Sequence, residues 1–226
     1  MTSHGDPDGG LPTKGDLAYA RVRAMVLSGE LEPGSVVPQA RLAQSIGVST
    51  TPLREAMRRL SVEGLVSLGA HRDARVAHLT AEEARDLVEL RRSLDPLACS
   101  LAAERRTSAE LDRMRATLAG CRALPDDPDA ADLAAHRAFH RAVYVASHNA
   151  VLVATLDGLW DRTDRYRLLG LRSPRDQAAR DRTDQEHEQL VDAVARGDAE
   201  AAATVMERHV EHSLGARAAQ RLDGHR

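Results

Sequence analysis

The sequence predicts a mainly α-helical protein, in which an N-terminal winged helix-turn-helix is followed by an all-helical antiparallel bundle domain. Three observations support this fold class. Hydrophobic residues make up 42% of the 226 residues but aromatic residues only 2%, so the core must be built from Leu, Val and Ala, which suits packed helices. Helical segments, sharp turns and a short hairpin share the first third of the chain. After Thr80, no segment shows the pattern of a strand.

The first third begins with two helical segments. Residues 17–27 have helical periodicity, and the run "SGELEPGS" ends that helix with two glycines and a proline. A shorter helix follows near residues 38–46. Gly47 suits the tight turn after it, because glycine adopts the left-handed conformation at low cost.

A third helix and a hairpin complete this region. Ser49, Thr50 or Thr51 can cap the helix, whose apolar residues Leu53, Met57 and Leu60 recur at helical spacing. The runs "LVSL" and "ARVAHL", joined by "GAHRD", look like a small hairpin. The order helix, helix, turn, helix and hairpin is that of a winged helix-turn-helix.

Arg54 and Arg58 lie one turn apart on the third helix. If the apolar residues of that helix are buried, both guanidinium groups point outward together, where they can reach phosphates and base edges. A solvated amphipathic helix would show the same arginine pair, so the pair alone leaves both interpretations open.

From Thr80 onward the sequence predicts helices only, and Thr80 and Glu83 form a capping-box pattern in front of the first. We therefore expect a disordered tail over 1–13, the winged domain over 14–78 and a helical domain over 79–222. The helices of the last are expected near residues 81–105, 108–123, 130–147, 150–169, 175–196 and 198–220.

Composition indicates which partners and which cellular compartment to expect. The net charge of −3 gives no bulk electrostatic attraction to nucleic acid or membrane, so any DNA affinity must come from local placement of arginines. Cys99 and Cys121 form no metal or redox motif and are expected to be reduced thiols. The chain has no apolar run long enough to cross a membrane and no secretory signal. We expect a cytoplasmic protein.

The stretch "HRAFH" places His136 and His140 on one helical face together with Phe139 and Val143, which is the apolar face. The same periodicity turns His187 and His209 inward on their own helices. One such histidine would more often be a hydrogen-bonded core residue. Four are hard to bury separately, because each needs partners for its ring nitrogens. A shared divalent metal ion, such as zinc or nickel, would satisfy all four.

Arg91 lies at the edge of a predicted inward stripe formed by Leu87, Leu90, Leu94, Leu97 and Leu101. A guanidinium on a buried face needs an anion. Two partners are equally possible from the sequence: an internal salt bridge to Asp95, or the carboxylate of a bound effector.

Two linked resemblances cover nearly the whole chain. The run "SGELEPGSVVPQARLAQSIGVSTTPLREAMRRLSVEGLV" resembles the DNA-binding domain of the GntR family of bacterial transcription regulators. The segments "LRRSLDPLA", "FHRAVYVASHN" and "EHEQLVDAVARGDAEAAATVMERH" resemble the FCD-type effector domain of its FadR subfamily. The resemblance implies a homodimer that binds a pseudo-palindromic operator in double-stranded DNA and responds to a small carboxylate effector.

The first resemblance also implies which residues contact DNA. Arg54 matches a DNA-contacting arginine, Thr50 stands where the family commonly has a DNA-reading arginine, and Asp73 replaces a glycine common in the wing. The resemblance therefore implies DNA binding but does not give the operator sequence. The full set of expected DNA-binding residues is Arg41, Ser49, Thr50, Thr51, Arg54, Arg58, His71 and Arg72.

The second resemblance implies a metal site of one aspartate and three histidines. His140, His187 and His209 match the three histidines, and His136 stands in the place of the aspartate. Asp132, one turn before it, is a candidate for orienting a ligand. The effector carboxylate would meet the metal and Arg91.

The sequence bears on three classes of function. The favoured one is a regulator that senses a carboxylate through a metal. A metal-dependent enzyme is disfavoured, because Arg137 occupies the position where a zinc peptidase motif needs a glutamate, and the paired Glu-x-x-His motifs of di-iron bundles are missing. A DNA-binding protein whose helical domain only dimerises is the remaining alternative.

Overall fold

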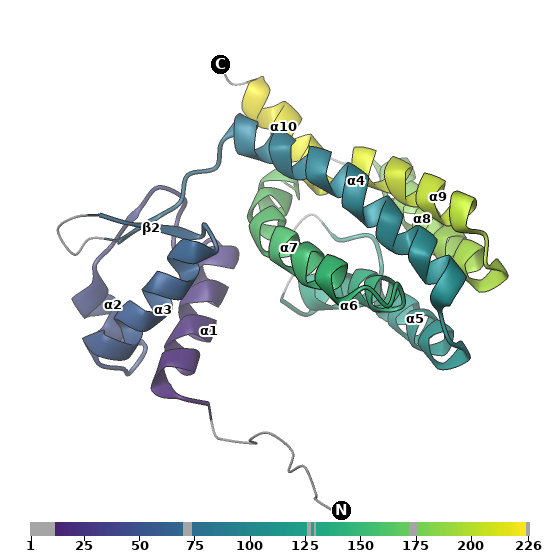
Figure 1. The fold of residues 1–226 in the computed structure, drawn as a ribbon. Coiled ribbons are helices and arrows are strands. Elements are labelled where there is room, and N and C mark those ends of the chain that lie inside the picture. Colours follow the sequence, from purple (N-terminus) through teal and green to yellow (C-terminus); the bar gives the residue numbers. More distant parts are fainter. Residues whose placement is uncertain (1–11, 70–73, 126–127, 129, 172–175, 225–226) are drawn as a thin grey trace, which may run out of the picture. The chain divides into compact units, whose positions relative to one another are not determined.

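The computed structural model describes residues 12–69, 74–125, 128, 130–171 and 176–224. The chain divides between His78 and Leu79 into two compact units, both visible in Figure 1. The predicted fold class is confirmed: a small winged helix-turn-helix precedes an all-helical unit.

The first unit combines three helices with a three-stranded antiparallel sheet. Strand β3 lies in the middle and pairs with both β1 and β2. The predicted hairpin is β2 and β3, whereas β1 was not predicted, because two residues are too few to show strand alternation. In chain order the elements are α1 (Lys14–Leu27), β1 (Val36–Val37), α2 (Gln39–Ser45), α3 (Thr50–Val62), β2 (Val66–Leu68) and β3 (Ala74–Val76).

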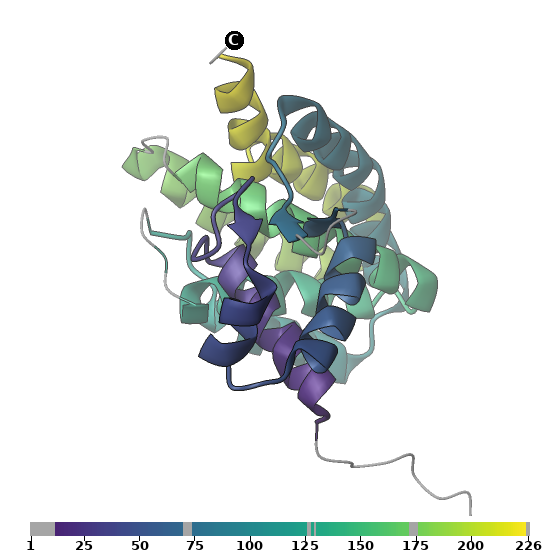
Figure 2. The same cartoon turned by 90° about the vertical axis from the view of Figure 1, so that its left-hand side faces the viewer.

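Helix α3 is held by its apolar face. Leu53, Met57 and Leu60 are buried in one cluster with residues of α1 and α2, and α3 lies beside α1 in both views (Figure 1 and Figure 2). Gly47, with φ of +72°, makes the turn between α2 and α3. This packing leaves the opposite face of α3 to solvent.

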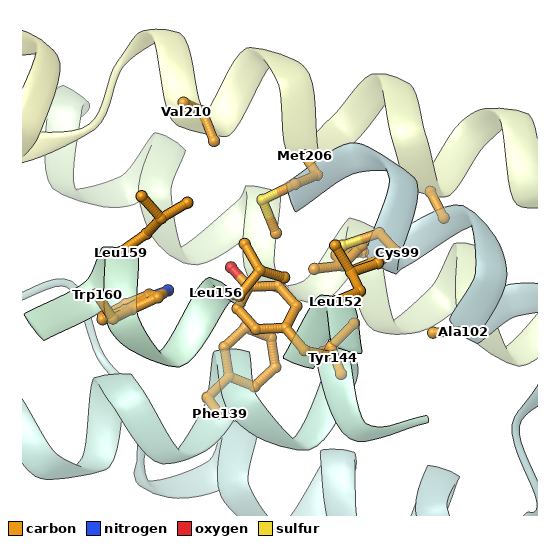
Figure 3. Close-up of a cluster of buried hydrophobic side chains, with 14 of the residues drawn as sticks. Cys99, Ala102, Phe139, Tyr144, Leu152, Leu156, Leu159, Trp160, Met206 and Val210 are labelled. Atoms are coloured by element: carbon orange, nitrogen blue, oxygen red, sulfur yellow. The ribbon is translucent and has the colours of Figure 1, made fainter. Parts of the chain in front are cut away.

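The second unit is a bundle in which α4 packs against α6, α7, α8, α9 and α10. Side chains from α4, α6, α7 and α9 meet in its core, among them Cys99, Tyr144, Leu156 and Met206 (Figure 3). Both cysteines are free and buried. The helices are α4 (Ala81–Arg105), α5 (Ser108–Gly120), α6 (Ala130–Val145), α7 (Ala150–Leu171), α8 (Gln177–Arg196), α9 (Ala199–Glu211) and α10 (Leu214–Asp223).

Two sequence predictions for this unit were wrong. The helix expected over 198–220 is two helices, because Ser213 caps α10 by accepting a hydrogen bond from the Ala216 N–H. The stripe expected to face inward on α4 is divided: Leu87 is buried, but Leu90 and Leu97 are 48% and 45% exposed. The inner face of α4 is formed instead mainly by alanines, together with Leu87, Arg91 and Asp95.

Gly170 marks the closest approach of two helices. A Cβ atom added there would lie 2.2 Å from the backbone oxygen of Leu214, where α10 meets α7. Gly170→Ala should therefore lower the free energy of unfolding by about 1–3 kcal/mol, since backbone must shift to admit the methyl group.

Gly158 is the matched control on the same helix. A Cβ atom there meets nothing within 4 Å, so Gly158→Ala should stabilise the protein by about 0.5–1 kcal/mol through higher helix propensity. Denaturant unfolding of both variants measures the difference. Equal stability of the two variants would contradict the packing of α10 on α7.

Candidate functional site

The structure brings together all four histidines that the sequence singled out. His136 and His140 come from α6, His187 from α8 and His209 from α9, and all four are buried. One candidate ligand atom from each residue lies within 4.8 Å of the others. The ring centroids of His140 and His209 are 5.1 Å apart, and those of His187 and His209 are 4.8 Å apart. We call these four residues the histidine cluster.

The outward nitrogens of two of the rings have partners. His209 Nδ1 lies 3.0 Å from a carboxylate oxygen of Glu186, and His187 Nδ1 lies 3.7 Å from the sulfur of Cys121. Contacts of this kind fix the ring orientation and leave Nε2 to face a common centre. Glu186 was not predicted, although it directly precedes His187 in the sequence.

Several ring nitrogens of the histidine cluster are buried and lack hydrogen-bond partners among the described residues. They are Nδ1 of His136, both ring nitrogens of His140 and Nε2 of His187. Unpaired polar atoms in a protein interior cost free energy, so several of them around one centre indicate a missing shared partner.

The histidine cluster has the charge state that a metal ligand requires. Burial lowers the pKa of His136, His140 and His187 well below the usual range, and neighbouring histidines lower it further for each of the three. The rings are therefore neutral near pH 7, with lone pairs available for coordination.

The spacing also fits a metal. Zinc binds imidazole nitrogen at about 2.0–2.1 Å, so ligand nitrogens around one ion lie no more than about 4.2 Å apart. The 4.8 Å limit of the cluster is slightly wider than this, so side-chain rotations would have to bring the nitrogens to a common ion. Buried residues from three helices can thus hold one divalent cation.

Arg91 forms the salt bridge that the sequence offered as one of two alternatives. Its Nε and Nη2 donate to one carboxylate oxygen of Asp95 at 3.0 and 2.6 Å, and the Tyr144 hydroxyl donates to the same oxygen at 3.0 Å. The guanidinium is only 4% exposed. Removing Arg91 alone would therefore leave the buried carboxylate of Asp95 without its cationic partner.

Arg91 also lines a cavity of about 170 Å³ that reaches the histidine cluster. The sequence analysis missed two other lining residues, Trp160 and Arg167. Their spacing of seven puts both on one face of α7, and a cation on that apolar face is the same signal that drew attention to Arg91. Residues around the cavity include Arg91, His136, Trp160, Arg167, Glu186 and His209.

The predicted DNA-contacting side chains of the first unit are exposed. Arg54 and Arg58 point outward from α3, and Arg41 lies exposed on α2. Ser49 is the N-cap residue of α3 and is exposed together with Thr50 and Thr51. His71, Arg72 and Asp73 fall outside the described residues.

Comparison with known proteins identifies both units. Residues 14–76 match the model of the bacterial regulatory proteins of the gntR family, and residues 86–212 match the FCD domain. The chain belongs to the GntR family of transcription regulators. It is a DNA-binding regulator with a C-terminal FCD domain, and its relatives are regulators rather than enzymes.

Two relatives and one solved structure show the extent of the similarity. The chain is 30% identical over 197 residues to a "Probable D-xylose utilization operon transcriptional repressor" of Paenarthrobacter nicotinovorans, covering 85% of this chain and 84% of that protein. It is 30% identical over 216 residues to a "Putative L-lactate dehydrogenase operon regulatory protein" of Escherichia coli, covering 84% and 81%. The structure of Escherichia coli McbR/YncC has the same fold, with a TM-score of 0.76 at 20% identity and coverage of 89% and 95%.

Among the described residues of this GntR-family chain, no helix has both the length and the apolar character needed to span a bilayer.

The buried histidines predict a pH dependence of stability in the metal-free protein. An unfolded histidine has a pKa of about 6.5, and the folded values of His136, His140 and His187 lie well below it. As the pH falls below about 6.5, the unfolded chain takes up protons that the folded chain does not. The free energy of unfolding should therefore fall by up to about 1.4 kcal/mol per pH unit for each histidine, and these groups should contribute no slope above that pH.

Denaturant unfolding between pH 7.5 and pH 5.5 measures this slope. His140→Asn should reduce it, because it removes one of the buried histidines. A wild type with equal stability at the two pH values would contradict neutral burial of the cluster.

Proposed function

We propose that this GntR-family regulator is a homodimer whose operator binding is controlled by a small carboxylate effector at a metal site in the FCD domain. The observation that carries the proposal is the histidine cluster, whose buried ring nitrogens lack hydrogen-bond partners among the described residues. The cluster lies beside a cavity lined by Arg91 and Arg167. Neutral imidazoles suit zinc or nickel, and arginines suit carboxylates.

The operator-binding surface in this proposal is the exposed face of α3 and its N-terminus. Arg54 and Arg58 would contact base edges or phosphates, and Ser49, Thr50 and Thr51 would approach the DNA at the start of the helix. Arg41 would add a phosphate contact from α2. By contrast, Arg59 is engaged within the unit, since it donates to Asp16 and packs on the Tyr19 ring.

Arg54→Ala should lose operator binding while the fold remains intact, because the side chain is exposed. The expected cost is about 1–3 kcal/mol per half-site. Binding sites can be selected from a random DNA pool with the wild type and then tested by gel shift at fixed salt. Arg21→Ala, at an exposed arginine of α1, serves as the control. Unchanged affinity of the Arg54 variant would overturn the assignment.

In the FCD domain, His136, His140, His187 and His209 would hold the metal, and Glu186 would orient His209. When bound, the ion would supply a positive centre that a carboxylate oxygen can approach. Asp132 is half-buried at the start of α6 and remains a candidate for orienting His136. The alternative, an FCD domain that only dimerises, would show operator binding that responds to neither metal nor acid.

His136 distinguishes this site from one with an aspartate at that position. Four neutral imidazoles leave the full charge of a divalent ion in a buried setting, where uncompensated charge is costly. An anion from solution should neutralise part of that charge, and it should therefore bind more tightly than in a site that already has a carboxylate ligand.

His136→Asp should therefore retain metal but bind carboxylates more weakly. Calorimetric titration of the zinc-loaded wild type and variant with the same acid, citrate for example, compares the two affinities. Equal affinity would show that His136 does not set the charge of an anion site.

The homodimer in this proposal uses the outer face of α4. Leu90 and Leu97 are exposed there. Leu94 and Leu101 lie at helical spacing with them and are partly buried against the core; we call these four residues the outer stripe. A pseudo-palindromic operator requires two DNA-binding units related by two-fold symmetry. Burying the outer stripe against its copy would remove apolar surface from water.

Leu97→Glu should convert the dimer to a monomer, because it places a charge in the proposed two-fold contact. Light scattering after gel filtration measures the mass. Val151→Glu is the matched control: Val151 is 78% exposed on α7 and lies outside the outer stripe. A dimeric Leu97 variant, or a monomeric wild type, would exclude this interface.

A further inference from the structure

Arg167 is a buried cation whose hydrogen-bonding capacity is only partly used. It is 3% exposed, and its Nη1 donates to a carboxylate oxygen of Asp164 at 2.9 Å. Its Nη2 is buried and has no hydrogen-bond partner among the described residues, and the side chain lines the cavity beside the histidine cluster. An unpaired donor on a side chain that lines a cavity is the local feature expected of an anion-binding position.

Arg167 and Arg91 each pair with one carboxylate. Asp164 pairs with Arg167, and its other carboxylate oxygen lies 3.6 Å from Nη1 of Arg137, which also pairs with Asp161. Arg91 pairs with Asp95. What distinguishes the Arg167 side is therefore the unused donor Nη2 rather than a surplus of charge.

Trp160 brings the two buried arginines together. The guanidinium carbons of Arg91 and Arg167 lie 5.0 and 4.8 Å from the centroid of its ring. The indole holds both cations beside one small space, next to the ring of His136 at 5.7 Å. A single short ligand can thus meet the histidine cluster and both arginines.

The charge and size of this space define the ligand class. With a divalent ion on four neutral imidazoles, a monocarboxylate would leave excess positive charge in the cavity, whereas a dianion would balance it. A cavity of about 170 Å³ is comparable to the ~150 Å³ cavity that accommodates benzene in an engineered protein. That volume suits an acid of about eight non-hydrogen atoms.

We propose that Arg167 is a second anion-binding residue of the FCD cavity and that the effector is a short dicarboxylate. One carboxylate faces the histidine cluster and Arg91, and the other accepts a hydrogen bond from Nη2 of Arg167. This inference rests on the proposed function, because it requires an acid-binding metal site, and it adds the charge and length of the acid.

Trp160 is the only tryptophan of the chain, so its fluorescence reports on this cavity alone. Zinc-loaded wild type is titrated with malonate, succinate and glutarate, and with butyrate, which matches succinate in length but has one carboxylate. We expect the best dicarboxylate to bind at least about tenfold more tightly than butyrate, as one additional charge-assisted contact provides.

Substitution of Arg167 assigns that difference to its side chain. Arg167→Gln should remove the preference for the dicarboxylate by weakening its binding more than that of butyrate, and Arg167→Lys should restore part of the preference. Arg162→Gln is the matched control, since Arg162 is also on α7 and pairs with one carboxylate, that of Glu83, but does not line the cavity. It should behave as the wild type does.

The outcomes of these titrations test this inference separately from the proposed function on which it rests. Equal wild-type affinity for butyrate and all three dicarboxylates, or a preference that survives in Arg167→Gln, overturns the role of Arg167 alone. Zinc-loaded protein that binds no acid of either kind overturns the proposed function as well. If Arg167→Gln does not fold, the wild-type comparison and Arg167→Lys still decide the question.

Discussion

Burial of four imidazoles around one point is the constraint on which the helical unit depends. His136 and His140 are fixed one turn apart on α6, while α8 and α9 each contribute one ring, so packing of the three helices buries nitrogens that cost free energy unless they share a partner. Desolvation keeps the rings of His136, His140 and His187 neutral. A divalent cation meets both requirements at once, and it would also tie α6, α8 and α9 into one rigid element.

Charge balance links this centre to its surroundings. Arg91, Asp95 and Tyr144 form a nearly closed buried group, whereas Arg167 shares its carboxylate with Arg137 and keeps an open donor. In the proposed function a divalent ion would add positive charge to this cavity, and an acid that enters it would supply the balancing negative charge. Such an acid would contact residues of several helices, which is a physical route for changing the conformation of the FCD domain.

The fold was largely predictable because its signals are local. Leu53, Met57 and Leu60 repeat at helical spacing, and the glycines mark turns, so α3 and its exposed arginines followed from the sequence. The histidines were found because each lies on an apolar face. Asp95 as the partner of Arg91 could not be chosen, because the rotamer of a long side chain depends on tertiary packing. The outer stripe was misplaced because α4 has apolar residues on both faces, and local spacing does not say which face meets the bundle.

The most direct test of the central claim is the metal content of the purified protein after equilibrium dialysis against zinc. The account predicts one zinc ion per chain in the wild type and none in a His140→Asn/His187→Asn double variant that retains its helical circular dichroism. A wild type that binds no ion, or a double variant that keeps one ion per chain, would contradict a metal centre at the histidine cluster.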